Sequence, residues 1–109
     1  MPDQHTYIVV LVTAKDEQEA QAIAQALLKD KLVACVNILP GVKSFFWWDG
    51  KIDKAEEVML VLKTRKALFK EVEVKVRSVH SYQTPEIIAI PIIAGNDDYL
   101  NWINDATHH

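Results

Sequence analysis

The chain has 109 residues, of which 50% are hydrophobic and 25% charged, and its formal net charge is −3. This composition is typical of one globular domain and excludes long disordered segments. No apolar run reaches the ~18 residues of a membrane span, and the negative net charge argues against a nucleic-acid partner, because phosphate binding is driven by clustered lysine and arginine. We therefore predict a single domain over residues 1–109, ordered over about 5–106, with neither a membrane nor a nucleic acid as partner.

The cysteine content and the N-terminus both bear on the compartment. Cys35 is the only cysteine, which excludes an internal disulfide and agrees with a reducing environment. The first residues lack the basic start and apolar stretch of a secretory signal peptide. We expect a cytoplasmic protein.

The first predicted strand covers residues 5–13 (HTYIVVLVT), a β-branched run whose spacing indicates a strand buried on both faces. A helix is predicted next, with Thr13 as its N-cap and Asp16 in the capping-box position three residues later. Apolar residues recur in this helix at the spacing of one face. They are Ala20, Ile23, Ala24, Leu27 and Leu28.

Two long strand-like segments, over about residues 32–48 and 51–64, are predicted to fold about Asp49-Gly50. This residue pair favours the two positive φ angles of a type I′ hairpin turn. Pro40-Gly41 predicts a bulge in the first segment, because proline lacks a hydrogen-bond donor and glycine permits the bend. Four aromatic residues precede the turn, and we expect another copy of the chain to cover them. They are Phe45, Phe46, Trp47 and Trp48.

Thr64 is predicted to cap a second helix, whose apolar residues run from Leu68 to Val79. Three valines in this segment also alternate with charged residues, so a strand is the local alternative. We prefer the helix because it supplies the crossover to the next strand, residues 86–94. Pro91 within that strand indicates a sheet edge. Gly95-Asn96-Asp97 then predicts the start of a short last helix.

The predicted order of elements is βαββαβ followed by a terminal helix. This order is the ferredoxin-like plan of the α+β class, here with a long central hairpin. In that plan the second and fourth strands form the sheet edges, so the long aromatic segment is an open edge unless another chain pairs with it. We expect a homo-oligomer.

Four segments occur in the order and spacing of one known family. They read LVACVNILPGVKSFFWWDGKI, EEVMLVLKT, HSYQTPEIIAIPI and YLNWI. Over residues 7–103 the chain thereby resembles the CutA divalent-cation tolerance proteins. The resemblance implies a ferredoxin-like homotrimer, related in architecture to the PII signalling proteins, with hairpins that reach across neighbouring subunits. It also implies a link to copper and other divalent ions.

Two departures from the family pattern concern the metal and the loop. Some bacterial members associated with copper carry a cysteine in the first strand and a His-His pair before the loop. The matching positions here are Val12 and Val79, so that only His80 remains. The family loop reads His-Pro-Tyr-x-x-Pro-Glu, whereas Ser81 follows His80 in this chain. We expect a more flexible loop.

Cys35 and His80 are the side chains whose chemistry suits copper or zinc. Neither belongs to a local metal motif, so a site would have to be assembled by folding or between subunits. Each has a structural alternative: Cys35 as a small buried apolar residue, and His80 as a loop histidine bonded to the backbone. His108 and His109 at the C-terminus receive no functional weight.

The loop that begins at His80 is dense in hydrogen-bonding groups, which makes it a candidate ligand site. With two charged residues of the preceding strand it would form a mixed-charge cleft for an anion or a metal complex. The alternative is that these residues only fix the loop and seal the subunit contact. The predicted cleft residues are Glu57, Lys63, Tyr82, Thr84 and Glu86.

The sequence contains no nucleophile–base set, phosphate loop or dinucleotide fingerprint, so we predict a protein that is not an enzyme. Our leading hypothesis is a homotrimer of divalent-cation tolerance or response. It would bind copper or another divalent cation weakly, with His80 as the best single ligand. The alternative is a PII-like small-ligand sensor or protein-interaction scaffold without a dedicated metal site.

Overall fold

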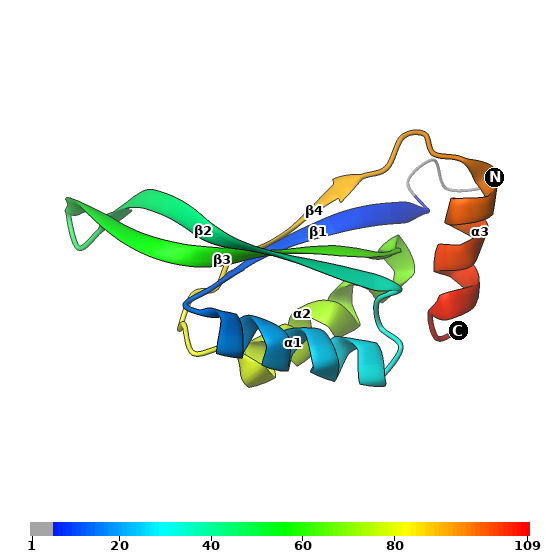
Figure 1. Ribbon diagram of the computed structural model, residues 1–109, viewed down its shortest axis with the longest axis horizontal. Coiled ribbons are helices and arrows are strands. Elements are labelled where there is room, and N and C mark those ends of the chain that lie inside the picture. The colour runs from blue at the N-terminus through cyan, green and yellow to red at the C-terminus, as the bar shows by residue number, and fades with distance from the viewer. Residues whose placement is uncertain (1–5) are drawn as a thin grey trace.

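The computed structural model describes residues 6–109, so the predicted start of the first strand at His5 lies outside the described residues. These residues form one antiparallel sheet in the order β2-β3-β1-β4, together with three α-helices (Figure 1). The predicted α+β class and the βαββαβ order with a terminal helix are confirmed, and the sheet order is the ferredoxin-like one. The elements are β1 (Tyr7–Ala14), α1 (Glu17–Lys29), β2 (Cys35–Trp48), β3 (Lys51–Arg65), a 3-10 turn (Lys66–Leu68), α2 (Phe69–Val79), β4 (Ile87–Pro91) and α3 (Asp97–Ala106).

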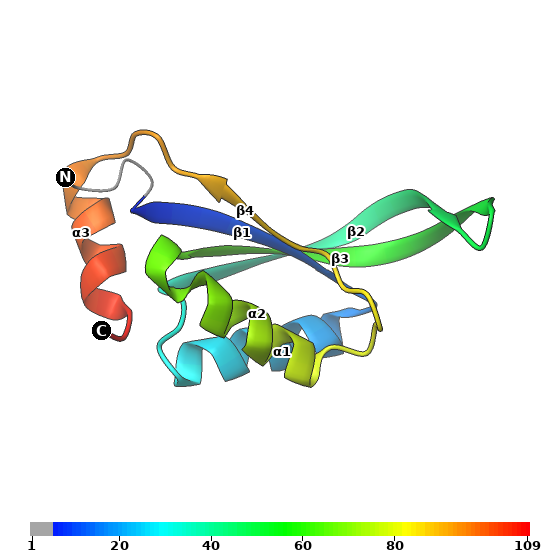
Figure 2. The same cartoon turned by 180° about the vertical axis from the view of Figure 1, so that it is seen from behind.

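Helices α1 and α2 lie side by side on one face of the sheet, as Figures 1 and 2 both show. Because successive strand residues point to opposite faces, every second residue of the central strands faces these helices. Residues 8–14 of β1 and 58–64 of β3 alternate in this way, and their helix-facing members are buried. The largest fully buried side chains include Ile23, Leu27, Leu60 and Leu62. The core therefore lies between this face and the two helices.

The opposite face of the sheet is covered by neither α1 nor α2. Tyr7, Val9 and Leu11 of β1 are only half-buried there, so the predicted burial of the first strand on both faces is wrong for the single chain. Ile88 and Ile90 of β4, which pair with Leu11 and Val9, are about half exposed on the same face. One chain thus leaves an apolar sheet face open.

Strands β2 and β3 form a hairpin that projects beyond the helices (Figure 1), and the chain extends 46 Å along its longest axis. Asp49 and Gly50 have φ angles of 53° and 75°, so the type I′ prediction is confirmed. The pairing register shifts between Leu39 and Val42, which is the predicted bulge at Pro40-Gly41. Strands β2 and β4 are the sheet edges, also as predicted.

Both predicted helix caps are wrong. Asp16 caps α1 by accepting the Glu19 N–H at 2.8 Å, while Thr13 still belongs to β1. Thr64 belongs to β3, and its buried hydroxyl donates to the Leu32 carbonyl oxygen at 2.6 Å. Threonine suits strands as well as caps, and here the strands continue past it.

The remaining helix predictions are confirmed. Residues 69–79 form a helix rather than the alternative strand, and the last helix begins after Asn96. Across residues 6–109 the structure contains no helix with the length and apolar character needed to span a membrane.

Candidate functional site

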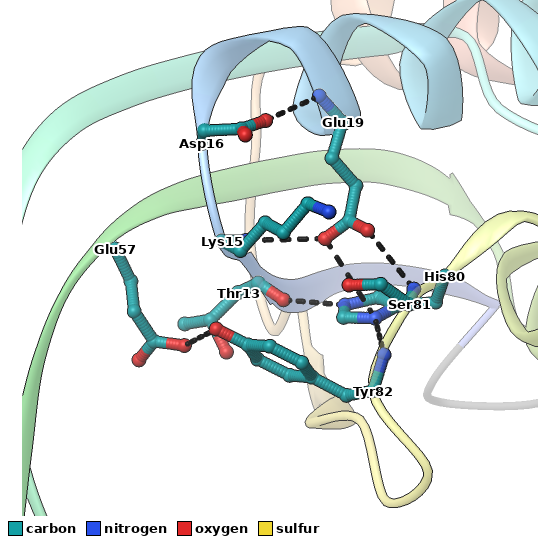
Figure 3. A network of polar contacts seen from close by, with 8 residues as sticks. All are labelled: Thr13, Lys15, Asp16, Glu19, Glu57, His80, Ser81 and Tyr82. Atoms are coloured by element: carbon teal, nitrogen blue, oxygen red, sulfur yellow. Dashed lines mark hydrogen bonds and ion pairs between the residues drawn. The ribbon is translucent and has the colours of Figure 1, made fainter.

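The loop that follows α2 brings His80 against the end of β1, where its side chain is fully buried (Figure 3). Both ring nitrogens have a partner. Nε2 lies 2.7 Å from the carbonyl oxygen of Thr13, and Nδ1 accepts the backbone N–H of Tyr82 at 3.0 Å. Because a carbonyl oxygen only accepts, this pattern assigns the hydrogen to Nε2 and makes the ring neutral.

Glu19 connects α1 to this loop. Its carboxylate accepts the backbone N–H of Lys15 at 3.1 Å and that of Ser81 at 2.9 Å, and it lies 3.8 Å from Nδ1 of His80. Burial acts to raise the pKa of Glu19. The hydrogen bonds from Ser81 and Lys15 outweigh burial, so the pKa lies below its ordinary value of 4.5. Glu19 therefore holds the loop as a carboxylate.

Tyr82 extends the network to β3. Its hydroxyl donates to the nearly buried carboxylate of Glu57 at 2.9 Å, and its ring centroid lies 4.8 Å from that of His80. The pKa of Tyr82 is raised to about 12. Burial is the largest cause, followed by the hydrogen bond and charge of Glu57 and then by the charges of Glu19 and Asp16. The carboxylates of Glu57 and Glu19 that contribute to this rise would also attract a cation.

The polar side chains of the network have hydrogen-bond partners, but they do not form a complete metal site. Among residues 6–109, no three His, Cys, Asp or Glu side chains converge in a way that could hold a metal ion. A cation that bound Nδ1 of His80 would have to displace the Tyr82 N–H. The arrangement can attract a cation through its carboxylates, and a full ligand set would need groups from elsewhere.

Cys35, the other predicted metal ligand, lies at the opposite end of the sheet. It pairs with Lys63, which in turn pairs with Val9 of β1. Thr13, the partner of the His80 ring, is four residues further along β1, about 13 Å away along the strand. One chain therefore does not bring Cys35 and His80 together.

The half-buried Cys35 has polar neighbours from β2, β3 and α3. Its thiol donates to the side-chain oxygen of Asn37 at 3.7 Å, and that oxygen also accepts from Lys63. Burial, and then the charge and hydrogen bonding of Cys35, raise the pKa of Tyr99. Lys63 belongs to this group and not to the predicted cleft, because six residues of β3, about 20 Å, separate it from Glu57.

The other predicted site residues fall into two sets. Tyr82 and Glu57 are joined by their hydrogen bond, and Thr84 and Glu86 are exposed in the same loop. The four hairpin aromatics are exposed in the single chain, Trp47 by 73%. Their coverage by another copy stays a prediction.

Two members of the network, Glu19 and Thr13, do not emerge from sequence reasoning. For Glu19 a signal exists, because Asp16-x-x-Glu19 is itself a capping pattern once the helix start is placed at Asp16. Thr13 contributes through its backbone carbonyl. No side-chain pattern could have revealed that role.

The family model described as CutA1 divalent ion tolerance protein matches residues 8–106. The chain belongs to the CutA1 family. The match covers the fold from β1 to the end of α3 and so includes every residue of the His80 network. It confirms the resemblance seen in the sequence segments.

Two CutA relatives each match most of this chain. "Divalent-cation tolerance protein CutA" of Archaeoglobus fulgidus is 50% identical over 96 residues, which are 88% of this chain and 93% of that protein. "Protein CutA 1, chloroplastic" of Oryza sativa subsp. japonica is 41% identical over 100 residues, which are 92% of this chain and 56% of that protein. The solved structure of the periplasmic CutA from A. fulgidus has a TM-score of 0.90 at 48% identity and covers 92% of this chain and 97% of its own.

The structure shows the surroundings of the residues that depart from the CutA pattern. Val12 is fully buried in the core, and Val79 packs against the core, so neither presents a polar group to the network. Ser81, where the family loop carries proline, donates its N–H to Glu19. Proline has no N–H and could not make this bond.

Proposed function

We propose that this chain is a non-enzymatic, homotrimeric protein of divalent-cation tolerance or response that binds such ions weakly. Its membership in the CutA1 family supports the link to divalent ions. The observation that carries the proposed binding region is the pair of nearly buried carboxylates, of which Glu57 accepts a hydrogen bond from Tyr82 and Glu19 lies 3.8 Å from His80.

We assign His80 as the nitrogen ligand in this region, because imidazole suits copper and zinc. Glu57 and Glu19 supply carboxylates nearby, and Thr84 and Glu86 line the same loop. Binding through Nδ1 replaces the Tyr82 hydrogen bond, whose net worth is about 1 kcal/mol. This replacement, together with an incomplete ligand set in one chain, favours weak binding.

Cys35 is proposed as a separate ligand for a soft ion, since a thiolate prefers Cu(I) and similar ions. It lies with Lys63 and Asn37 and away from His80, so the two ligands serve different sites unless a neighbouring subunit joins them. Copper is our first candidate, and other divalent cations follow.

The proposed trimer accounts for surfaces that one chain leaves open. These are the apolar sheet face, the two edge strands β2 and β4, and the exposed aromatics at the hairpin tip. Sedimentation at micromolar concentration should give three times the chain mass of 12.4 kDa. A monomer under these conditions would contradict the proposal.

The cytoplasmic location stays a prediction. One relative is named as chloroplastic, and the solved A. fulgidus structure is named as periplasmic. Fractionation of the native host, followed by detection of the chain, would decide the compartment.

Calorimetric titration with Cu(II) and Zn(II) tests the binding proposal. The background variant carries His108→Ala and His109→Ala, because terminal histidines bind metal on their own. We expect a Kd of roughly 1 μM to 1 mM, weakened by His80→Gln and by Glu57→Gln. Glu56→Gln, an exposed carboxylate beside Glu57 on β3, is the matched control and should leave Zn(II) binding unchanged. Nucleotide binding without metal binding would favour the sensor alternative, and binding of neither would refute both.

A further inference from the structure

A groove of about 750 Å³ lies between the end of α1, the helix α2 and the C-terminal residues. Four lysines line it, against the two carboxylates of Asp30 and Glu71. This leaves an excess of two positive charges on a chain whose net charge is −3. The lysines are Lys29, Lys31, Lys70 and Lys75.

The carboxylates of the groove neutralise only part of this charge. Asp30 forms an ion pair with Lys75 at 2.8 Å, which joins the end of α1 to α2. The hydrogen bond and charge of Lys75 lower the pKa of Asp30. Among residues 6–109, Lys31 forms no ion pair with a carboxylate. Its ammonium group, like that of Lys29, therefore has no carboxylate among these residues that neutralises it directly.

The backbone of Lys31 is in the left-handed region, with a φ angle of 55°. It occupies the position after the α1 C-cap in a Schellman motif: its N–H bonds to the Leu28 carbonyl, and the N–H of Leu32 bonds to the Leu27 carbonyl, both at 3.0 Å. Glycine is the usual residue there, because a side chain is strained at this φ. A charged side chain held in a strained position is a reason to look for a ligand.

The same residue is anchored from a second direction. The carbonyl oxygen of Lys31 accepts the N–H of His108 at 2.8 Å. Arg65 in turn holds the C-terminal segment through the Thr107 hydroxyl at 3.0 Å and through the His108 carbonyl. The rim of the groove is therefore fixed by α1, β3 and the C-terminal segment before any ligand arrives.

We propose that this groove binds a small anion that carries linked phosphate groups, with Lys31 as the main contact. Lysine ammonium groups are established phosphate ligands, and several around one groove favour a polyphosphate over a single phosphate. Val74, 61% exposed at the groove, offers an apolar surface to whatever body carries the phosphates. The groove shares no residue with the His80 network, so its ligand and the divalent cation bind at separate places.

Calorimetric titration of the full chain with pyrophosphate, inorganic phosphate and ATP, without divalent ions, tests this site. Pyrophosphate should bind the parent chain and bind more weakly as salt is added. Lys31→Glu should weaken binding by roughly tenfold or more. Lys51→Glu makes the same charge change on the exposed hairpin and serves as the matched control, which should leave binding intact.

Lys31→Gly is the decisive variant, because glycine relieves the positive φ and keeps the fold while the ammonium group is removed. Loss of pyrophosphate binding in this variant supports the proposal. If ATP binds more tightly than pyrophosphate, the proposal is supported and the nucleoside makes a further contact. If the two bind equally, the proposal is supported and the groove recognises the phosphate groups alone. Unchanged binding in Lys31→Gly, equal weakening in Lys51→Glu, or no pyrophosphate binding by the parent chain would each overturn it.

Discussion

The charged side chains of the network around His80 are buried, whereas those of the lysine groove at the end of α1 are mostly exposed. In the network, the carboxylates of Glu19 and Glu57 are nearly buried and accept hydrogen bonds from the loop. In the groove, Lys29 and Lys31 are exposed, and Lys31 has no carboxylate partner among the described residues. The contrast suggests that network charges hold the fold, whereas groove charges contribute little to it and remain available to a ligand.

Removing the Glu19 side chain should have the largest effect of the substitutions considered. Glu19→Ala leaves the backbone N–H groups of Ser81 and Lys15 without their acceptor, and we expect a loss of about 2–4 kcal/mol in the free energy of unfolding. Urea unfolding measures this loss. Glu17→Ala, in the same first turn but exposed, is the control and should change stability little. Equal effects would break the contrast between buried and exposed charges.

The pH dependence of the Glu19 contribution has a definite sign. Because its pKa is lowered in the folded state, its stabilisation is complete above its ordinary value of 4.5 and is lost as the pH falls through the lowered value. The stability difference between the parent and Glu19→Gln should therefore shrink on acidification below 4.5. A difference that grows there would contradict the role of Glu19 as a carboxylate.

Tyr82→Phe should have the next largest effect, a loss of about 1–3 kcal/mol, because Glu57 loses a buried donor. The raised pKa of Tyr82 means that its contribution is complete below the ordinary value of 10.0 and is lost as the pH rises through about 12. Ultraviolet absorbance should show that the phenolate titration at about 12 disappears in Tyr82→Phe. It should persist in the control Tyr99→Phe, and its persistence in Tyr82→Phe would refute the assignment.

In the groove, Lys31→Gly should change stability in the opposite direction. Relief of the positive φ outweighs the greater flexibility of glycine in the unfolded chain, and we expect a gain of about 0.5–1 kcal/mol. Thermal and urea unfolding measure the gain. A clear loss would mean that the lysine side chain supports the fold, and the contrast between the two regions would fail.

The smallest effect is expected for the ion pair between Lys75 and Asp30. Both side chains are more than a third exposed, so water and salt screen their attraction. Asp30→Asn should leave the urea midpoint nearly unchanged. A large shift would show that this pair, like the network, carries structural weight.

The hairpin could be predicted because its signals are local. Asp49-Gly50 determines the turn through backbone conformation, and Pro40-Gly41 determines the bulge. The strand positions of Thr13 and Thr64 could not be predicted, since threonine suits a strand as well as a helix cap. Instead of capping a helix, Thr64 donates a hydrogen bond to the distant Leu32 carbonyl oxygen, which no local pattern reveals.

The candidate site was predictable only in part for the same reason. Tyr82 and Glu57 belong to one region, as the sequence indicates, because a polar loop follows the second helix. Lys63 lies apart from them, since the strand register places it with Cys35. The His80 contacts pass largely through backbone groups, which leave no trace in the residue pattern.

Amide chemical-shift mapping during a Zn(II) titration would locate the bound cation on the chain with His108→Ala and His109→Ala. We predict that the amides of Tyr82 and Ser81 shift first, as the ion displaces the Tyr82 N–H from His80, while the amide of Lys31 stays unchanged. Saturating shifts confined to other parts of the chain, or none at Tyr82, would contradict the claim that divalent cations bind at the His80 network.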